Sequence, residues 1–118
     1  MEELLALLFL SRDIAHRKHL TTDSYSEHMA LGSFYEDVVG LADSLAEAYQ
    51  GRTGKRLSEI PHYDNPIKGT ILSTISKLLV EVEKHKETCC KGDSTLLNLL
   101  DEVIALYLST IYKLTFLK

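Results

Sequence analysis

The placement of helix-breaking residues constrains this chain more than any other feature of its sequence. Only two of its 118 residues are prolines and six are glycines, and Pro61 and Pro66 both fall in one central segment. Outside that segment, apolar side chains recur every three or four residues, the spacing that places them on one face of an α-helix. The sequence therefore predicts long helices on either side of a connection over residues 52–69.

Four helices follow from the apolar runs and from the turn residues between them. Their expected ranges are about 2–19, 24–50, 70–88 and 95–117. A Ser24-x-x-Glu27 capping box begins the second helix, although Thr22 or Asp23 could serve as its cap, and Gly51 is expected to end it. Short, long and short connections predict one all-α domain over the whole chain, a four-helix bundle with a long crossover between helices 2 and 3.

Charge and composition exclude several classes of protein. A net charge of −4 without a cluster of Lys and Arg argues against DNA binding through a broad basic face, because phosphate contacts supply most of that affinity, and leaves only a local patch for such binding. The apolar run over residues 4–10 follows two glutamates, unlike a signal peptide, and no run reaches the roughly 20 residues that span a bilayer. The adjacent Cys89 and Cys90 fit neither a disulfide framework nor a zinc motif. We therefore expect a cytoplasmic protein with no membrane partner.

The expected fourth helix is apolar on more than one side. Its apolar residues are Leu96, Leu97, Leu99, Leu100, Val103, Ile104, Leu106, Leu108, Ile111, Leu114, Phe116 and Leu117. A single copy of a small bundle cannot cover all of these side chains. The sequence therefore predicts a homo-oligomer.

A polar stripe runs along the expected second helix. At 100° per residue, its members fall within an arc of about 100°. They are His28, Gly32, Glu36, Asp43 and Glu47. The turn before this helix centres near Thr22, so an antiparallel pair of helices places His16 level with His28. We expect these two imidazoles to face each other.

One chain cannot complete a metal site from this stripe. His28 and Asp43 are fifteen residues apart, or about 22 Å along the helix axis. A second, antiparallel copy of the helix, related by a two-fold axis near residues 36 and 37, would place His28 of one chain beside Asp43 and Glu47 of the other. Imidazole and carboxylate donors together suit iron, with manganese or zinc as alternatives.

The candidate ligands also occur at the spacing of a known signature. These ligands are His16, His28, Asp43 and Glu47. Together with Phe34 and the run over residues 41–47, they make residues 15–50 similar to the ferroxidase region of the Dps-type mini-ferritins. The resemblance implies a ferritin-like four-helix subunit that stores and oxidises iron, generally in hollow dodecamers. It also implies that the two histidines come from one subunit and the two carboxylates from its two-fold neighbour.

Three departures from that family pattern favour a second interpretation. Gly32 stands where the family usually has an acidic ligand, and Glu36, one turn further along the stripe, is the candidate substitute. Arg17 replaces a common tryptophan, and no lysine-rich terminal tail is present. The short chain also resembles small ferritin-like proteins predicted in tailed-phage genomes. The alternative is therefore a noncatalytic structural or interaction protein, such as a phage accessory or virion component, with a degenerate metal site.

The remaining histidines and Tyr35 receive structural interpretations. His19, His62 and His85 are expected to be capping or surface residues, and Tyr35 is expected to pack in the core or at an interface. The chain contains no Glu-x-x-His, which argues against a di-iron site within one subunit. No catalytic residue is expected beyond the metal ligands.

Overall fold

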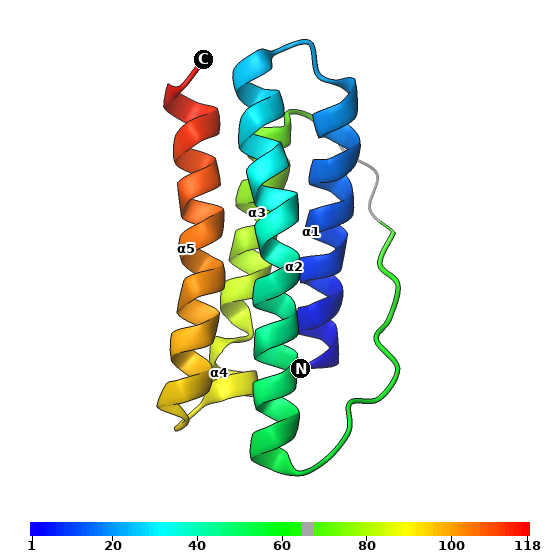
Figure 1. The fold of residues 1–118 in the computed structure, drawn as a ribbon, viewed down its shortest axis with the longest axis vertical. Helices are drawn as coiled ribbons and strands as arrows, with labels where there is room; N and C mark the ends of the chain where they lie inside the picture. The colour runs from blue at the N-terminus through cyan, green and yellow to red at the C-terminus, as the bar shows by residue number, and fades with distance from the viewer. Residues whose placement is uncertain (65–67) are drawn as a thin grey trace.

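Four long helices run side by side, and a fifth, short helix lies near one end (Figure 1). They are α1 (Glu2–Thr21), α2 (Tyr25–Thr53), α3 (Ile71–Lys84), α4 (Lys86–Cys90) and α5 (Ser94–Phe116). The computed structural model describes residues 1–64 and 68–118, and no strand occurs within these ranges. The prediction of an all-α helical bundle is confirmed.

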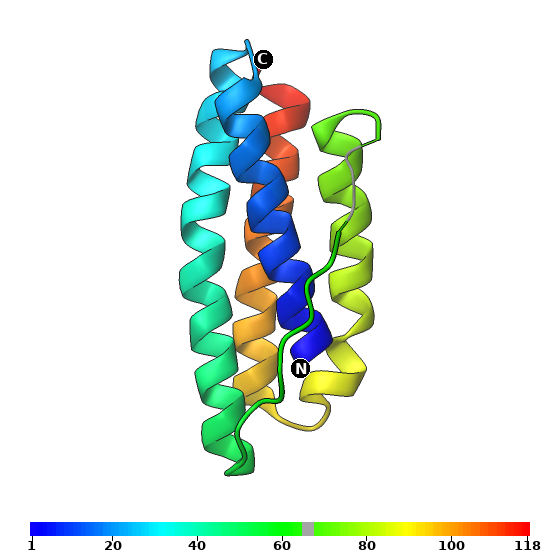
Figure 2. The ribbon, with the colours of Figure 1, turned by 90° about the vertical axis from the view of Figure 1, so that its right-hand side faces the viewer.

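The four long helices form a ring of neighbours. Both α1 and α5 pack against α2 and against α3, so α1 faces α5 across one diagonal and α2 faces α3 across the other. The described part of the connection between α2 and α3 passes along the outside of the bundle (Figure 2). α3 begins at the end of the molecule opposite to the end of α2, so α2 and α3 run in the same direction.

Hydrogen bonds from helix residues hold the first part of this connection. The backbone N–H of Leu57 donates to Oε1 of Gln50 at 3.1 Å, and that of Ser58 donates to Oε2 of Glu2 at 2.8 Å. The Ser58 N–H thereby lowers the pKa of the Glu2 carboxyl. Residues 57–60 form no helical turn, so this part of the predicted connection is irregular.

Tyr107 on α5 carries a buried polar contact at the centre of the core. Its hydroxyl donates to Oγ of Ser11 on α1 at 2.6 Å, and Ser11 in turn donates to the Leu7 carbonyl at 2.8 Å. The Phe34 ring packs edge-on against Tyr107, with ring centroids 4.9 Å apart. Burial raises the pKa of the Tyr107 phenol, and the bond to Ser11 opposes this only in part. The phenol therefore stays protonated and links the diagonal helices α1 and α5.

The helix boundaries confirm some of the expected signals and correct others. Ser24 caps α2, because its Oγ accepts a hydrogen bond from the Glu27 N–H. The expected end at Gly51 is wrong, since α2 continues to Thr53 and Gly54 ends it with φ 69°. That left-handed conformation is the one that glycine adopts at helix ends at little cost.

The expected third helix over residues 70–88 is divided in two. α3 ends at Lys84, His85 forms the break, and α4 follows in a new direction across the end of the bundle. This change of direction buries Cys89 and Cys90 against the core, where a disulfide joins the two adjacent residues. The sequence analysis did not predict this disulfide.

Candidate metal centre

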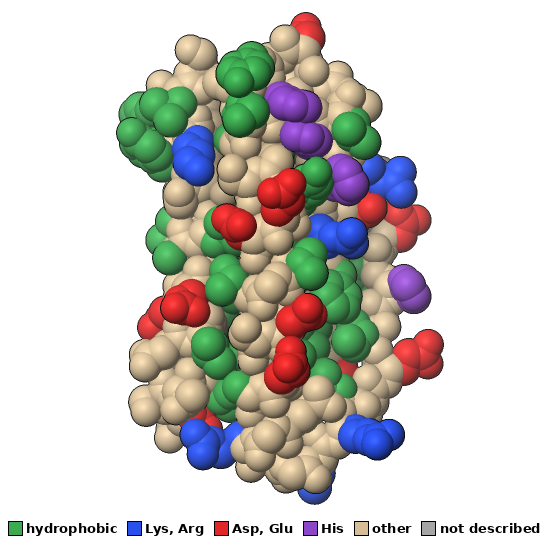
Figure 3. Space-filling view, viewed as in Figure 1, with side chains coloured by type: hydrophobic (Ala, Val, Ile, Leu, Met, Phe, Trp, Pro, Cys, Tyr) green, Lys and Arg blue, Asp and Glu red, His purple; other side chains and the backbone are tan. Residues whose placement is uncertain are grey.

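Three histidines and one tyrosine meet beside the turn between α1 and α2. We call this group the histidine cluster, and it consists of His16, His19, His28 and Tyr35, all half-buried. The His19 and His28 rings stack with centroids 3.8 Å apart and planes 14° from parallel. The Tyr35 ring lies 4.0 Å from His16 and 5.1 Å from His19. Histidine side chains gather accordingly on the upper part of the face in Figure 3, with acidic side chains below them.

Two reciprocal hydrogen bonds fix the orientation of the stacked rings. Nδ1 of His19 donates to the His28 carbonyl at 2.6 Å, and Nδ1 of His28 donates to the His19 carbonyl at 2.7 Å. A carbonyl only accepts hydrogen bonds, so both Nδ1 atoms carry a proton and each neutral ring keeps its lone pair on Nε2. Histidine ligands of metals are commonly held in this way, with the second ring nitrogen bonded to a carbonyl.

Gly32 makes this stacking sterically possible. A Cβ atom at position 32 would lie 3.0 Å from Cε1 and 3.2 Å from Nδ1 of His19. The His19 ring therefore fills the space beside position 32, where the Dps-type pattern has an acidic side chain. Glycine here has a packing role that the sequence analysis did not identify.

The expected pairing of His16 with His28 is wrong. Because α1 ends at Thr21 and α2 begins at Tyr25, the turn centres near residue 23 rather than residue 22. With the turn centred at residue 23, His28 lies level with residue 18, which is closer to His19 than to His16. His19, expected to be a capping or surface residue, is the functional candidate that the sequence analysis missed, and counting outward from the correct turn would have identified it.

The candidate carboxylates lie apart from the histidine cluster within one chain. Glu36, Asp43 and Glu47 are exposed on α2, and among the described residues Asp43 and Glu47 form no hydrogen bond or ion pair. Within residues 1–64 and 68–118, no group of three or more His, Cys, Asp or Glu side chains is close enough to hold a metal ion. Among the described residues of one chain, the imidazoles and the carboxylates therefore form two separate groups.

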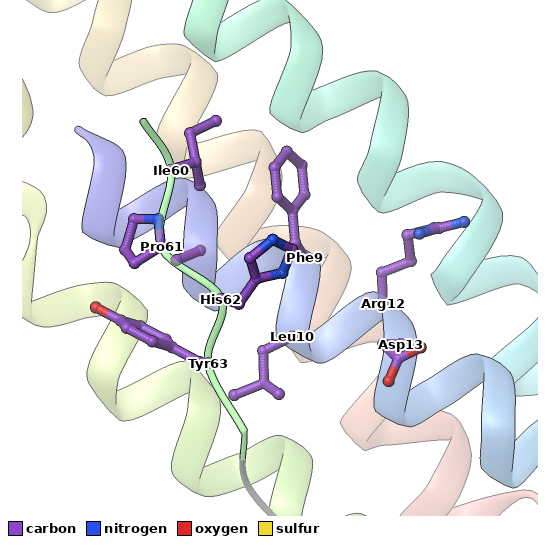
Figure 4. A pocket seen from close by; sticks show the side chains of 9 residues that line it. Phe9, Leu10, Arg12, Asp13, Ile60, Pro61, His62 and Tyr63 are labelled. Carbon is purple, nitrogen blue, oxygen red and sulfur yellow. The ribbon is translucent and has the colours of Figure 1, made fainter. Parts of the chain in front are cut away.

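A groove of about 550 Å³ lies between α1 and the α2–α3 connection, away from the cluster. Figure 4 shows Phe9, Arg12 and Asp13 from α1 together with His62 and Tyr63 from the connection. The groove holds one histidine and one carboxylate, fewer metal-binding groups than the three histidines of the cluster. In one chain neither place is arranged to hold a metal ion among the described residues, and the histidine cluster is the candidate because it brings more imidazoles together.

Comparison with known proteins gives a family but no activity. No curated protein and no solved structure matches the chain. Residues 19–114 match a family described as a family of unknown function (DUF5856). The matched range includes His19, Gly32 and the carboxylates of α2, and it begins after His16. Because the match covers most of the chain, the protein belongs to this family of unknown function.

Proposed function

We propose that the protein binds ferrous iron at a site shared by two copies of the chain and promotes oxidation of that iron, in the manner of a Dps-type mini-ferritin. His28, together with His16 and His19 of the same cluster, supplies imidazole nitrogens from one copy, and Asp43 and Glu47 supply carboxylates from the other. Glu36 assists from the same stripe. Manganese and zinc are the alternative metals, since they accept the same donor atoms.

The fixed tautomer of the stacked rings is the observation that carries this proposal. His28 donates from Nδ1 to a carbonyl, so its Nε2 lone pair is available on a half-exposed ring. His19 is held in the same way and offers a second imidazole beside it. Neutral imidazoles oriented by a carbonyl bind divalent transition metals well.

Small side chains on α2 support close approach of a second copy. Across a two-fold axis between residues 36 and 37, Ser33 of one copy lies opposite Gly40 of the other. Both residues are exposed, and a Cβ at Gly40 would meet no atom within 4 Å. Glu36 and Asp37 of the two copies meet at the axis, where their repulsion opposes association, and metal bound between the imidazoles of one copy and the carboxylates of the other would offset it. Dimerisation through α2 is therefore metal-dependent.

The order of the helices supports a ferritin-like topology. The long connection joins α2 and α3, which lie diagonally opposite each other and run in the same direction. Single-crossover bundles of the ferritin type place their second and third helices in this relation. A dodecamer is the assembly that the family resemblance suggests.

The first test is a titration of metal-free protein with ferrous iron under anaerobic conditions, followed by addition of hydrogen peroxide. We expect saturable binding and faster oxidation than in buffer, and we expect His28→Ala to abolish both. His62→Ala is the matched control, because His62 is an exposed histidine outside the cluster. Equal loss in both variants would contradict a role for the cluster.

A complementation experiment tests whether the site is shared. A His28→Ala chain mixed with an Asp43→Ala, Glu47→Ala chain forms dimers in which one site keeps all its ligands. Random mixing should then restore about a quarter of the wild-type sites, because half of the dimers are mixed and each has one intact site. A site within one chain would give no recovery.

The second candidate function is that of a noncatalytic structural or interaction protein. The His19 ring beside Gly32 favours it, because that ring takes the place of an acidic ligand. In that case wild type and His28→Ala would both match buffer in the iron titration. The cluster would then serve only to join α1 to α2.

A further inference from the structure

The disulfide between Cys89 and Cys90 lies at the end of α4, just before the turn into α5. The two cysteines are neighbours, so their Cα atoms are 3.8 Å apart, the separation that one trans peptide fixes. In most disulfides the Cα atoms are about 4.4–6.8 Å apart, because the bond joins separate segments. The ring that Cys89 and Cys90 form, which we call the α4 ring, therefore constrains only the backbone around the peptide between them.

The α4 ring has no role as a cross-link. A disulfide stabilises a fold mainly by restricting the unfolded chain, and this effect grows with the number of residues that the bond encloses. No residue lies between Cys89 and Cys90, and the chain has no other cysteine with which either could pair. Disulfides outside the usual Cα separation are also reduced more readily, and labile disulfides commonly serve regulatory functions. The pairing of two neighbouring cysteines therefore favours reversible chemistry over stabilisation.

Local opening of α4 gives a thiol access to the ring. Cys90 is 1% exposed and Cys89 is 9% exposed, so Cys89 is the more accessible of the two. α4 has only five residues, and an exposed ion pair of 3.1 Å between Lys86 and Asp101 fastens its first residue to α5. Short segments with few contacts open at a low cost in free energy. Attack at Cys89 therefore requires no unfolding of the four long helices.

A hydrogen bond connects the α4 ring to the start of α5. The backbone N–H of Asp93 donates to the Cys90 carbonyl at 3.1 Å. The Asp93 side chain caps α5 by accepting hydrogen bonds from the N–H groups of Thr95 and Leu96. It also pairs with Arg52 of α2 at 2.6 Å. Opening the ring removes a backbone constraint one peptide before the carbonyl that holds Asp93, so the cap of α5 loses part of its support.

We propose that Cys89 and Cys90 are a reversible two-electron redox pair whose state controls the stability of the α4–α5 turn. The reductant is a dithiol. One of its thiolates attacks Sγ of Cys89 and releases the Cys90 thiolate, and its second thiol then displaces Cys89. The dithiol leaves as a disulfide, and each cysteine keeps one proton. A hydroperoxide closes the ring again: with hydrogen peroxide, the two thiols give one disulfide and two water molecules.

This redox pair is independent of the proposed iron site. The histidine cluster lies beside the α1–α2 turn, at the opposite end of the bundle from α4 (Figure 1). Loss of iron binding would therefore leave the chemistry of the α4 ring unchanged, and the two proposals fail separately.

The test equilibrates folded, metal-free protein in mixtures of reduced and oxidised dithiothreitol, traps free thiols with a maleimide and counts them by mass spectrometry. We expect one transition between zero and two trapped thiols, with the same midpoint from either direction. Hydrogen peroxide should return the reduced protein to zero thiols. Hydrogen exchange then compares the two states. Amides of residues 93–96 should exchange roughly fivefold faster in the reduced protein, the factor expected when one backbone hydrogen bond is lost, while amides of the α1–α2 turn should not change.

Cys89→Ser is the matched control, because serine is close to cysteine in size and cannot form the ring. In this variant, residues 93–96 should exchange at the rate of reduced wild type in every mixture. Circular dichroism verifies its helix content. Three results would overturn the proposal. The first is a ring that dithiothreitol reduces only after urea unfolds the protein. The second is peroxide treatment that leaves free thiols or joins separate chains. The third is equal exchange of residues 93–96 in oxidised and reduced wild type.

Discussion

Gly32→Ala tests the steric argument for the histidine cluster. Alanine in the interior of a helix normally stabilises a protein by about 1 kcal/mol relative to glycine. At position 32, however, the added Cβ would lie 3.0 Å from the His19 ring, which must then move. Movement of the ring disrupts the hydrogen bond from its Nδ1 to the His28 carbonyl, worth about 1 kcal/mol, whereas the bond from His28 to the His19 carbonyl does not involve that ring. The two effects are similar in size, so Gly32→Ala should leave the free energy of unfolding nearly unchanged, instead of raising it by about 1 kcal/mol.

Gly40→Ala is the matched control on the same helix. A Cβ at position 40 meets no atom within 4 Å, so this change should stabilise the protein by about 1 kcal/mol. Urea unfolding followed by circular dichroism measures both variants.

The same measurement in a His19→Ala background provides the decisive comparison. Without the His19 ring, Gly32→Ala should become stabilising, with a value close to that of Gly40→Ala. If Gly32→Ala stabilises the wild-type chain as much as Gly40→Ala does, then His19 does not occupy the space beside Gly32. The assignment of the cluster would then be wrong.

Three further predictions concern polar contacts elsewhere in the bundle. Tyr107→Phe removes the hydrogen bond to Ser11 and should cost about 1 kcal/mol in urea unfolding; a neutral result would contradict its contribution. Ser24→Ala removes the α2 cap and should also cost about 1 kcal/mol, measured as a lower urea midpoint. The backbone N–H of Leu96 and the Arg52 side chain hold the pKa of Asp93 below its usual range, so its stabilisation is present above the pKa of the unfolded chain and is lost as the pH falls through the lower, folded-state pKa. The urea midpoint of wild type should therefore fall more steeply below about pH 4 than that of Asp93→Asn, and parallel curves would refute this.

Periodic apolar spacing was sufficient to predict the all-α bundle, because each long helix buries one continuous face. Helix ends were less predictable, since Gly51 and Gly54 are both suitable stops and only tertiary packing decides between them. The same uncertainty of one or two residues affected the candidate site. The predicted centre of the α1–α2 turn was wrong by one residue. In an antiparallel pair this moves the position opposite His28 by two residues along α1, so His16 was predicted to face His28 where His19 does.

The role of Gly32 could not be read from sequence for a related reason. Its significance depends on the ring of His19, which reaches it from another helix. Spacing along α2 alone presents Gly32 only as a missing ligand. The burial of Cys89 and Cys90 is similarly invisible to motif spacing, since it depends on the change in direction at His85.

The buried hydroxyl of Tyr107 also bears on the uniqueness of the fold. Leucine-rich helices can slide past one another by one turn, about 5.4 Å, and still bury similar apolar area. Such a slip would carry the Tyr107 hydroxyl away from Ser11 and leave it unsatisfied in the core, at a cost of about 1–3 kcal/mol. One phenol at the centre of the diagonal thus selects a single axial alignment of α1 and α5 among alternatives that hydrophobic burial alone would leave nearly equal in energy.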